Sequence, residues 1–273
     1  MHWLIQRKFD YDPNYRKLLS NLERLNIPHS YCKVVPFTDD GIEWEDVPPE
    51  SHERCFASGS YTLAKIAKKY YYPGSFISEN LNLDNLLEHW KDEMFNSDMQ
   101  FATIRTADFT DTDLSRGIFI RPVEDTKSFC GGKMTYDEFT AWKQKLSMLK
   151  EDEFSTVDLD TRICWAKPKP IDYEVRFFIV DGKPVTWSEY KRGGQVGYKK
   201  DVDYDILYYV CGLVGDKPFN LDSYQPDKAY VLDIAVTDGV PKILEANSIN
   251  AVGLYACDTQ KLIMALEDLE YHL

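Results

Sequence analysis

Val, Ile, Leu and Tyr dominate two runs in the last third of the chain, within residues 228–246, and this pattern predicts a β-hairpin. The Asp238-Gly239 pair between the runs is a frequent hairpin turn. Side chains alternate between the two faces of a strand, so Glu245 and Asn247 are expected on the same face of the second strand. The hairpin therefore presents a carboxylate and a carboxamide side by side.

Acidic side chains within this apolar hairpin predict a metal site. Apolar residues flank Asp233 and Glu245, so both carboxylates are expected to be buried and to need a counter-charge such as Arg, Lys or a metal ion. With Asn247 they form a set of oxygen ligands, which suits Mg²⁺ or Mn²⁺ better than zinc. The alternative is that all three side chains lie on the solvated face of an ordinary hairpin.

The length of the turn decides whether Asp233 and Glu245 share a face. Directly opposed residues of two antiparallel strands point to the same side of the sheet. A two-residue turn opposes Asp233 to Leu244 and separates the carboxylates, whereas a three-residue turn at 237–239 places them diagonally on one face. We therefore predict an odd-length turn with Gly239 in the left-handed region.

The first hundred residues show the pattern of a small α/β domain. Apolar strands are predicted at 3–6 and 31–37, with a helix between them that begins at Asp12-Pro13. A further strand leads through the small residues at 58–60 into a second helix. Such a turn either binds an anion on free backbone N–H groups or is simply tight.

Further charged residues interrupt apolar or glycine-rich segments. Arg121 is the single charge of the run 117–123 and needs an anionic partner. The segment that follows is too polar and too rich in glycine for a core strand, and it carries Lys127 and Lys133. Its plain interpretation is an exposed turn with two surface lysines.

A second hairpin is predicted at 174–190. Glu174 and Arg176 share one face of its first strand, so they either pair with each other or serve as two ligand-binding groups. Lys191 and Arg192 follow directly, before two glycines. A basic glycine loop beside an acidic metal site suits the binding of a nucleotide and an anionic carboxylate.

The order of these motifs resembles the ATP-grasp superfamily. The L-D-I-A and I-L-E-A-N strands are similar to the family's metal-binding strands, which implies that Asp233, Glu245 and Asn247 hold the magnesium ions that bridge the phosphates of ATP. Most members have Lys-Pro where this chain has Arg121-Pro122, and one branch has Arg-Pro. The resemblance implies that Arg121 reaches the α-phosphate.

The same resemblance implies roles for the other charged groups. The segment with Lys127 and Lys133 is similar to the family's mobile loop over the triphosphate. Glu174 stands in the Asp position of the D-x-R strand of ligases that add amino acids to peptides, which places it among the nucleotide-binding residues. Arg176 is then expected to contact the transferred phosphate, and Arg192 a phosphate or carboxylate. The hinge that holds adenine is expected at Cys164, Trp165, Ala166 and Lys167.

The fold implied by the resemblance is of the α/β (α+β) class. It is an ATP-grasp fold of two α+β lobes, preceded by a small Rossmann-like pre-ATP-grasp domain. The shift in composition assigns the preceding domain to 1–98 and the ATP-grasp domain to 99–273, with a small lobe at 99–163 and a large lobe at 164–273.

The implied activity is that of an ADP-forming carboxylate–amine ligase. ATP activates a carboxylate as an acyl phosphate, and an amine of an amino acid, peptide or protein then attacks it. The expected partners are therefore small-molecule or peptide carboxylate and amine substrates. Two alternatives remain open, which are a phosphotransferase that uses the same ATP site on a hydroxyl and a nucleotide-binding module with little catalysis.

Composition excludes several other classes of protein. The formal net charge of -13 argues against general adhesion to nucleic acid or to an anionic membrane. No apolar run is long enough to cross a bilayer, and the N-terminus lacks the apolar segment of a signal peptide, so we expect a cytoplasmic protein. The 6 cysteines show no Cys-x-x-Cys spacing, which predicts neither a zinc site nor a disulfide framework.

Overall fold

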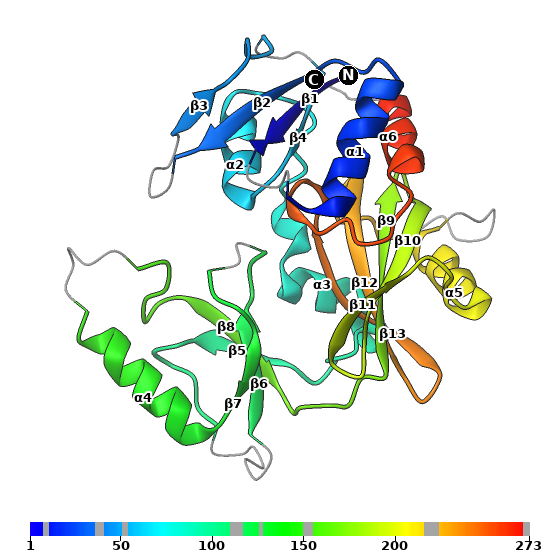
Figure 1. Cartoon of the computed structure of the whole chain (residues 1–273). Coiled ribbons are helices and arrows are strands. Elements are labelled where there is room, and N and C mark those ends of the chain that lie inside the picture. The colour runs from blue at the N-terminus through cyan, green and yellow to red at the C-terminus, as the bar shows by residue number, and fades with distance from the viewer. Residues whose placement is uncertain are drawn as a thin grey trace. The chain divides into compact units, whose positions relative to one another are not determined.

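The computed structural model describes residues 1–7, 11–35, 41–50, 54–109, 117–125, 128–149, 155–215 and 224–269. The chain forms two compact units (Figure 1). The first unit joins Met1–Leu81 with Ile171–Leu273, and the second spans Asn82–Pro170. The domain boundaries predicted after residues 98 and 163 stay predictions.

A four-stranded sheet forms in the first part of unit 1. Its strands, in the order β3-β2-β1-β4, are β1 (His2–Gln6), β2 (His29–Val34), β3 (Ile42–Trp44) and β4 (Cys55–Ser58). β1 is parallel to β2 and β4, and β3 is antiparallel to β2. Helix α1 (Pro13–Arg24) lies between β1 and β2 in the chain, and helix α2 (Tyr61–Lys69) follows β4.

The predicted strand–helix–strand opening is therefore present. Asp12 caps α1, because its carboxylate accepts a hydrogen bond from the backbone N–H of Asn14 at 2.8 Å, and Pro13 occupies the first turn. The role of this region as a pre-ATP-grasp domain stays a prediction.

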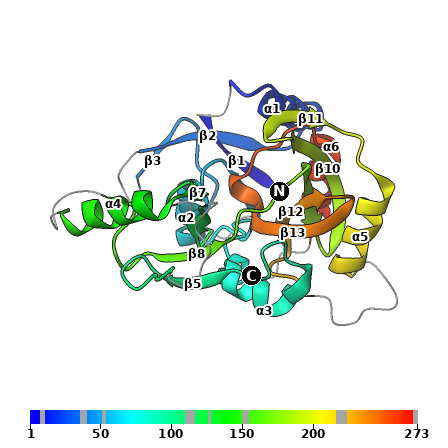
Figure 2. The same ribbon diagram turned by 90° about the horizontal axis from the view of Figure 1, so that it is seen from below.

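The larger sheet of unit 1 is antiparallel and has five strands. In the order β11-β10-β9-β12-β13, the strands are β9 (Tyr173–Val180), β10 (Lys183–Arg192), β11 (Gln195–Lys199), β12 (Ala229–Thr237) and β13 (Val240–Ser248). Helix α5 (Tyr204–Val214) lies beside β10, as Figure 2 shows. The chain continues from β13 through a 3-10 turn (Ile249–Ala251) to helix α6 (Thr259–Asp268).

One apolar core joins both parts of unit 1. Phe178 and Val231 of the larger sheet pack in it together with Leu18 of α1 and Leu262 of α6. Hydrogen bonds add to this contact, because the buried amide of Asn250 donates to two backbone carbonyl groups, at 2.7 Å and 2.8 Å, and accepts from a backbone N–H at 2.7 Å. The three partners are Ala57, Gly74 and Phe76. The end of β13 is thereby fixed against the first sheet.

The turn between β12 and β13 differs from the prediction. Thr237 opposes Val240, so the turn has two residues and the predicted odd length is wrong. Asp238 and Gly239 have φ angles of 51° and 76°, which is the left-handed conformation expected for Gly239 and typical of tight hairpin turns.

A β-bulge restores the alignment that an odd-length turn was expected to give. The register shifts between Asp233 and Ile234, so that Asp233 opposes Glu245 while Ile234 opposes Ile243, and Leu244 is the additional residue. A two-residue turn matches the twist of the strands, and the bulge moves the register change into the strand. The two carboxylates therefore lie on one face.

Unit 2 is built around a second antiparallel sheet. Its strands, in the order β5-β8-β6-β7, are β5 (Gln100–Thr103), β6 (Ile118–Pro122), β7 (Gly132–Met134) and β8 (Arg162–Ala166). Helix α3 (Leu83–Trp90) precedes the sheet, and helix α4 (Tyr136–Ser147) follows β7. Phe109, Phe139 and Trp165 form the aromatic centre of its core, with ring centroids 4.7 Å and 5.0 Å apart for the two pairs that involve Phe109.

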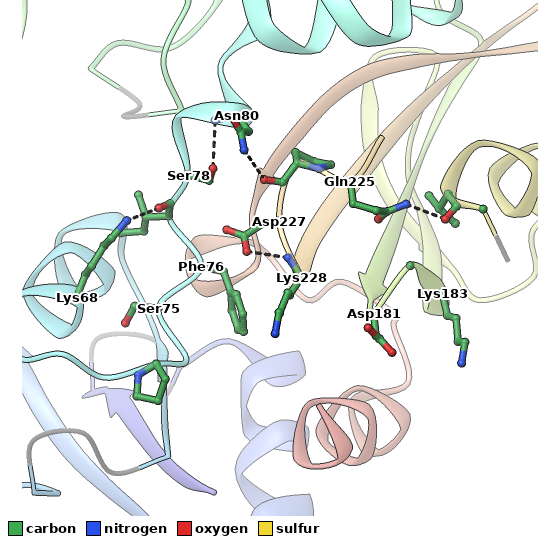
Figure 3. A pocket seen from close by; sticks show the side chains of 16 residues that line it. Lys68, Ser75, Phe76, Ser78, Asn80, Asp181, Lys183, Gln225, Asp227 and Lys228 are labelled. Atoms are coloured by element: carbon green, nitrogen blue, oxygen red, sulfur yellow. Dashed lines mark hydrogen bonds between the residues drawn. The ribbon is translucent and has the colours of Figure 1, made fainter. Parts of the chain in front are cut away.

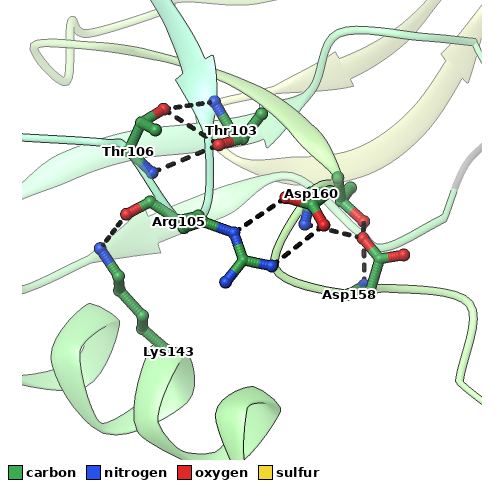
Figure 4. Close-up of polar contacts among 7 residues, drawn as sticks. Thr103, Arg105, Thr106, Lys143, Asp158 and Asp160 are labelled. Carbon is green, nitrogen blue, oxygen red and sulfur yellow. Dashed lines mark hydrogen bonds and ion pairs between the residues drawn. The ribbon is translucent and has the colours of Figure 1, made fainter. Parts of the chain in front are cut away.

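A surface network of polar groups holds the turn after β5 (Figure 4). Arg105 donates two hydrogen bonds to Asp160, at 2.9 Å and 3.0 Å, and Lys143 of α4 donates to the Arg105 carbonyl at 2.6 Å. Arg105 and Asp160 are well exposed, so solvent screens this pair and it adds little stability. Its effect is to fix the path of the loop against α4.

Candidate active site

A buried ion pair lies in the middle of the larger sheet. Arg176 of β9 directly opposes Asp233 of β12. Its guanidinium donates from Nε to Oδ1 of Asp233 at 2.8 Å and from Nη2 to Oδ2 at 2.7 Å. Arg176 also donates to the Gly253 carbonyl at 3.2 Å. The counter-charge that the sequence requires for Asp233 is thus an arginine.

Glu245 and Asn247 extend this row of polar groups along β13. Glu245 opposes Asp233, and Asn247 lies two residues further on the same face, as the alternation of side chains predicts. Asn247 is only 4% exposed, and its Nδ2 atom has no hydrogen-bond partner among the described residues. Such an unpaired buried amide is costly and marks a place where a ligand would bind.

These three side chains fit a magnesium ion better than a metal held by protein alone. No group of three or more His, Cys, Asp or Glu side chains in the described part of the chain is placed to hold a metal. Two carboxylates and one amide leave several coordination positions for other oxygens. Mg²⁺ commonly binds in this way, with one or two carboxylates and the phosphates of a nucleotide.

Electrostatics at Asp233 favour an added cation. Burial raises the pKa of Asp233 to about 6, although the guanidinium of Arg176 opposes this shift. The charge of Glu245 raises the same pKa further, because two carboxylates face each other. A divalent ion at this point would stabilise both ionised forms.

Glu174 does not take Arg176 as its partner. Its carboxylate accepts a hydrogen bond from the hydroxyl of Tyr190 at 2.6 Å and one from the ammonium of Lys191 at 2.7 Å. The pairing of Glu174 with Arg176, which the sequence left open, is therefore not formed. Glu174 instead orients two groups of β10.

Two tyrosine rings hold the Arg176 guanidinium in one orientation. The rings of Tyr190 and Tyr255 stack with centroids 4.8 Å apart and an interplanar angle of 5°. The Cζ atom of Arg176 lies 5.2 Å and 5.0 Å from these two centroids, at cation–π distance. Burial raises the pKa of Tyr255, so the ring stays neutral.

The sequence did not indicate these two rings. Tyr190 follows a predicted strand without any distinguishing pattern, and Tyr255 was noted only within a segment, 250–257, expected near the acceptor pocket. The positive φ of 49° at Tyr255 is an unusual conformation for a bulky residue and belongs to the turn that brings its ring over β10.

Arg192 forms a second bidentate pair at the end of β10. It donates to Glu189 at 2.8 Å and 2.6 Å, and its Cζ atom lies 4.2 Å from the ring centroid of Tyr173. The Arg192 side chain is 52% exposed, whereas that of Glu189 is 7% exposed. Gly193 and Gly194 follow with positive φ angles, and they reverse the chain into β11.

The remaining predicted residues lie in unit 2. Arg121 of β6 is partly buried and opposes Cys164 of β8, and Lys133 of β7 is exposed. Burial raises the pKa of Cys164 to about 12, so its thiol is a poor nucleophile. Lys127 lies outside the described residues.

The predicted adenine hinge is divided between core and surface. The ring of Trp165 packs in the core of unit 2, Ala166 is buried at the end of β8, and Lys167 is exposed just beyond it. Their contact with adenine stays a prediction.

A family profile decides which fold this is. The profile, described as an ATP-grasp domain and as family 3 of its clade, matches residues 73–266, which is more than half of the chain. The chain belongs to this ATP-grasp family.

Solved structures agree with this ATP-grasp assignment. The ATP-grasp ligase PsnB complexed with a minimal precursor is similar with a TM-score of 0.52 and 11% identity, over 97% of each chain. D-alanine–D-alanine ligase from Bacillus anthracis has a TM-score of 0.54 and 12% identity, over 98% of this chain and 96% of the other. A RimK domain ATP-grasp protein from Sphaerobacter thermophilus has a TM-score of 0.53 and 11% identity, over 92% of each chain.

Likeness at these identities establishes the fold, and the ATP-grasp fold expected from the sequence is confirmed. No curated protein sequence matches the chain. Within the described residues, no helix has both the length and the apolar character needed to cross a bilayer.

Proposed function

We propose that this ATP-grasp protein is an ATP-dependent, ADP-forming ligase that joins a carboxylate to an amine. Its family and the ligase names of similar structures support the proposal. The observation that carries it is the row of Arg176, Asp233 and Glu245 across three neighbouring strands. This row combines a fixed anion-binding guanidinium with metal-binding oxygens, which are the two requirements for handling a phosphorylated carboxylate.

ATP is the proposed cosubstrate, and Mg²⁺ or Mn²⁺ the proposed metal. Among the similar structures, a PsnB complex contains Mg and ADP, and a D-alanine–D-alanine ligase complex contains ATP. Asp233, Glu245 and Asn247 would hold the metal, which would neutralise charge on the nucleotide phosphates. Arg121 and Lys133 are proposed to bind those phosphates.

Arg176 is proposed to bind the phosphoryl group that is transferred. A carboxylate oxygen of the substrate attacks the γ-phosphorus, and the bond to ADP breaks. The amine then attacks the carbonyl carbon and loses a proton, and phosphate leaves. Negative charge grows first on the phosphoryl oxygens and then on the oxygen of the tetrahedral carbon, so a preorganised guanidinium lowers both barriers.

The basic end of β10 supplies further donors. Lys191 is oriented by Glu174, and Arg192 is oriented by Glu189 and by the ring of Tyr173. We assign Arg192 to a phosphate or carboxylate of the substrates, since its exposed guanidinium is able to reach a ligand. Glu174 is then a positioning residue for Lys191 close to the nucleotide.

The substrates are proposed to be small molecules or peptides. PsnB was solved with a precursor peptide, and D-alanine–D-alanine ligase is named for the joining of two amino acids. A peptide acceptor and a free amino acid thus both belong to the proposal. A cytoplasmic location, where ATP is available, is part of the same proposal, and cell fractionation tests it.

A screen for stimulated ADP release tests the proposed reaction. Amino acids, short peptides and polyamines are supplied in pairs with ATP and Mg²⁺, and mass spectrometry identifies the condensed product. We expect ADP release to require both a carboxylate and an amine, and to fall in the Glu245→Gln variant. ADP release on a hydroxyl compound alone would indicate a phosphotransferase. Nucleotide binding without release in any combination would indicate a binding module.

A further inference from the structure

A second cavity lies in unit 1, away from the row of charged groups described above. Its volume is about 800 Å³, which is within the range of small-molecule and peptide sites. Its walls come from α2 and the loop after it, from the β9–β10 turn, from the end of α5 and from the start of β12 (Figure 3). Five residues of β12 separate Lys228 from Asp233, which corresponds to about 17 Å of extended strand.

The walls of this cavity are held by hydrogen bonds. Lys68 donates to the Ile77 carbonyl at 2.6 Å, and Asn80 donates to the Pro226 carbonyl at 3.4 Å. On the other side, Gln225 donates to the carbonyl at the end of α5 at 2.7 Å and accepts from the hydroxyl of Tyr230 at 3.0 Å. The cavity therefore belongs to the folded chain and does not depend on a ligand to form it.

The cavity collects positive charge in an acidic protein. Lys68, Lys183 and Lys228 line it, and two aspartates, Asp181 and Asp227, line it as well. Three ammonium groups against two carboxylates give a net charge of about +1 locally, whereas the whole chain carries -13. An anionic group is thus attracted to this cavity more than to the rest of the surface.

The mixture of charges favours a peptide over a phosphate. A phosphate dianion would meet Asp181 and Asp227 as well as the lysines, and the carboxylates would repel it. An extended acidic peptide satisfies both kinds of group, because its side-chain carboxylates pair with the lysines while its backbone N–H groups donate to the aspartates. Buried apolar residues such as Phe76 and Pro226 supply contact area for its aliphatic parts.

We propose that this cavity binds an acidic segment of a peptide substrate, apart from the reaction centre. The proposal rests on the ligase function proposed above and names the class of substrate. Because Lys228 begins the strand that carries Asp233, an extended peptide of about six residues spans the distance between the cavity and the reacting groups. The lysines therefore contribute to selecting the substrate and take no part in the chemistry.

Fluorescence anisotropy of a labelled hexaglutamate peptide tests this site on the full chain, without nucleotide. We expect saturable binding that weakens at least tenfold in the Lys183→Glu/Lys228→Glu variant. The matched control is Lys17→Glu/Lys65→Glu, which makes the same change in net charge at exposed positions outside the cavity. Binding to the control is expected to stay within twofold of the original chain, and a labelled hexalysine peptide is expected to bind none of the three proteins tightly.

Several results would overturn the site. These are a failure of the original chain to bind hexaglutamate, equal weakening in both double variants, or no weakening in either. Competition by citrate at the same concentration as unlabelled peptide would show a small oligocarboxylate site and refute the peptide assignment. Unchanged affinity of the cavity variant for a non-hydrolysable ATP analogue shows that this variant is folded.

The two proposals fail separately. If hexaglutamate binds as expected but no carboxylate and amine pair stimulates ADP release, the ligase function is refuted and the peptide site stands. If a ligated product forms and peptide binding ignores the cavity lysines, the ligase function stands and the peptide site is refuted.

Discussion

Two arginine–carboxylate pairs lie on the same five-stranded sheet and differ in burial. Both are bidentate, and in both an aromatic ring lies near the guanidinium. The side chains of Arg176 and Asp233 are 9% and 0% exposed, in the interior of the sheet. That of Arg192 is 52% exposed at the end of a strand, where only its partner Glu189 is buried.

This difference separates a fixed anion-binding group from an adaptable one. The interior pair is surrounded by protein, so its geometry is set before a ligand arrives and its loss leaves an uncompensated charge. The edge pair exchanges readily with water, so Arg192 is able to leave Glu189 for a ligand at small cost. The proposed ligase uses the first for the transferred phosphoryl group and the second for substrate binding.

The largest expected effect comes from breaking the interior pair. Arg176→Leu leaves Asp233 buried without its counter-charge, and we expect the free energy of unfolding to fall by about 3–5 kcal/mol. Urea denaturation followed by circular dichroism measures this change. The matched variant Arg192→Leu is expected to lose less than about 1 kcal/mol. Similar losses in the two variants would contradict the distinction between the pairs.

A more conservative change tests the chemistry of the same arginine. Arg176→Lys keeps the charge and loses the fixed fork, so we expect turnover to fall about a hundredfold, equivalent to about 2.7 kcal/mol of transition-state stabilisation. Affinity for a non-hydrolysable ATP analogue, measured by calorimetry, is expected to change little. If that affinity collapses together with turnover, Arg176 holds the nucleotide and its role on the acyl phosphate must be withdrawn.

The pattern of the sequence was sufficient for the carboxylates of this site. The alternation of side chains places Glu245 and Asn247 on one face, and the apolar neighbours of Asp233 require a counter-charge; both expectations are met. These features are local, since they depend on one strand and its burial. The roles of these residues in binding metal and nucleotide stay predictions.

The partners of these carboxylates were beyond local reasoning. Whether Arg176 binds Glu174 or Asp233 depends on β9 lying beside β12 in one register, which a single strand does not encode. The bulge at Leu244 likewise follows from how two strands fit together, so the turn length was predicted wrongly while the shared face was predicted correctly. Tyr255 reaches the site through a return of the chain that has no periodic pattern.

Glu245→Gln removes one ligand charge from the interior site and is expected to have an intermediate effect. Turnover with Mg²⁺ as the only metal should fall about tenfold or more, equivalent to at least about 1.4 kcal/mol, because the amide binds the cation more weakly. The volume is unchanged, so the free energy of unfolding is expected to change by less. Unchanged ADP release would refute the catalytic assignment of Glu245.

The pH dependence of stability offers a smaller and independent test of Asp233. Its pKa in the folded chain is about 6, above the value of about 3.9 expected when unfolded, so its contribution to stability is full below about pH 4 and is lost as the pH rises to 6. Relative to Asp233→Asn, the original chain should therefore lose stability over this range in EDTA. Denaturation curves that keep a constant difference between the two proteins would contradict the raised pKa.

The smallest expected effect is the coupling within the edge pair. A double-mutant cycle of Arg192→Ala and Glu189→Ala, measured without nucleotide, should give a coupling free energy of about 0.5–1 kcal/mol. The exposed guanidinium is screened by water, and Lys199 lies 4.0 Å from Glu189, so the carboxylate keeps a second cation when Arg192 is removed. A coupling above about 2 kcal/mol would show that Arg192 is held as firmly as Arg176. In that case the edge arginine is not free to leave Glu189 for a substrate, and its proposed role in substrate binding would be lost.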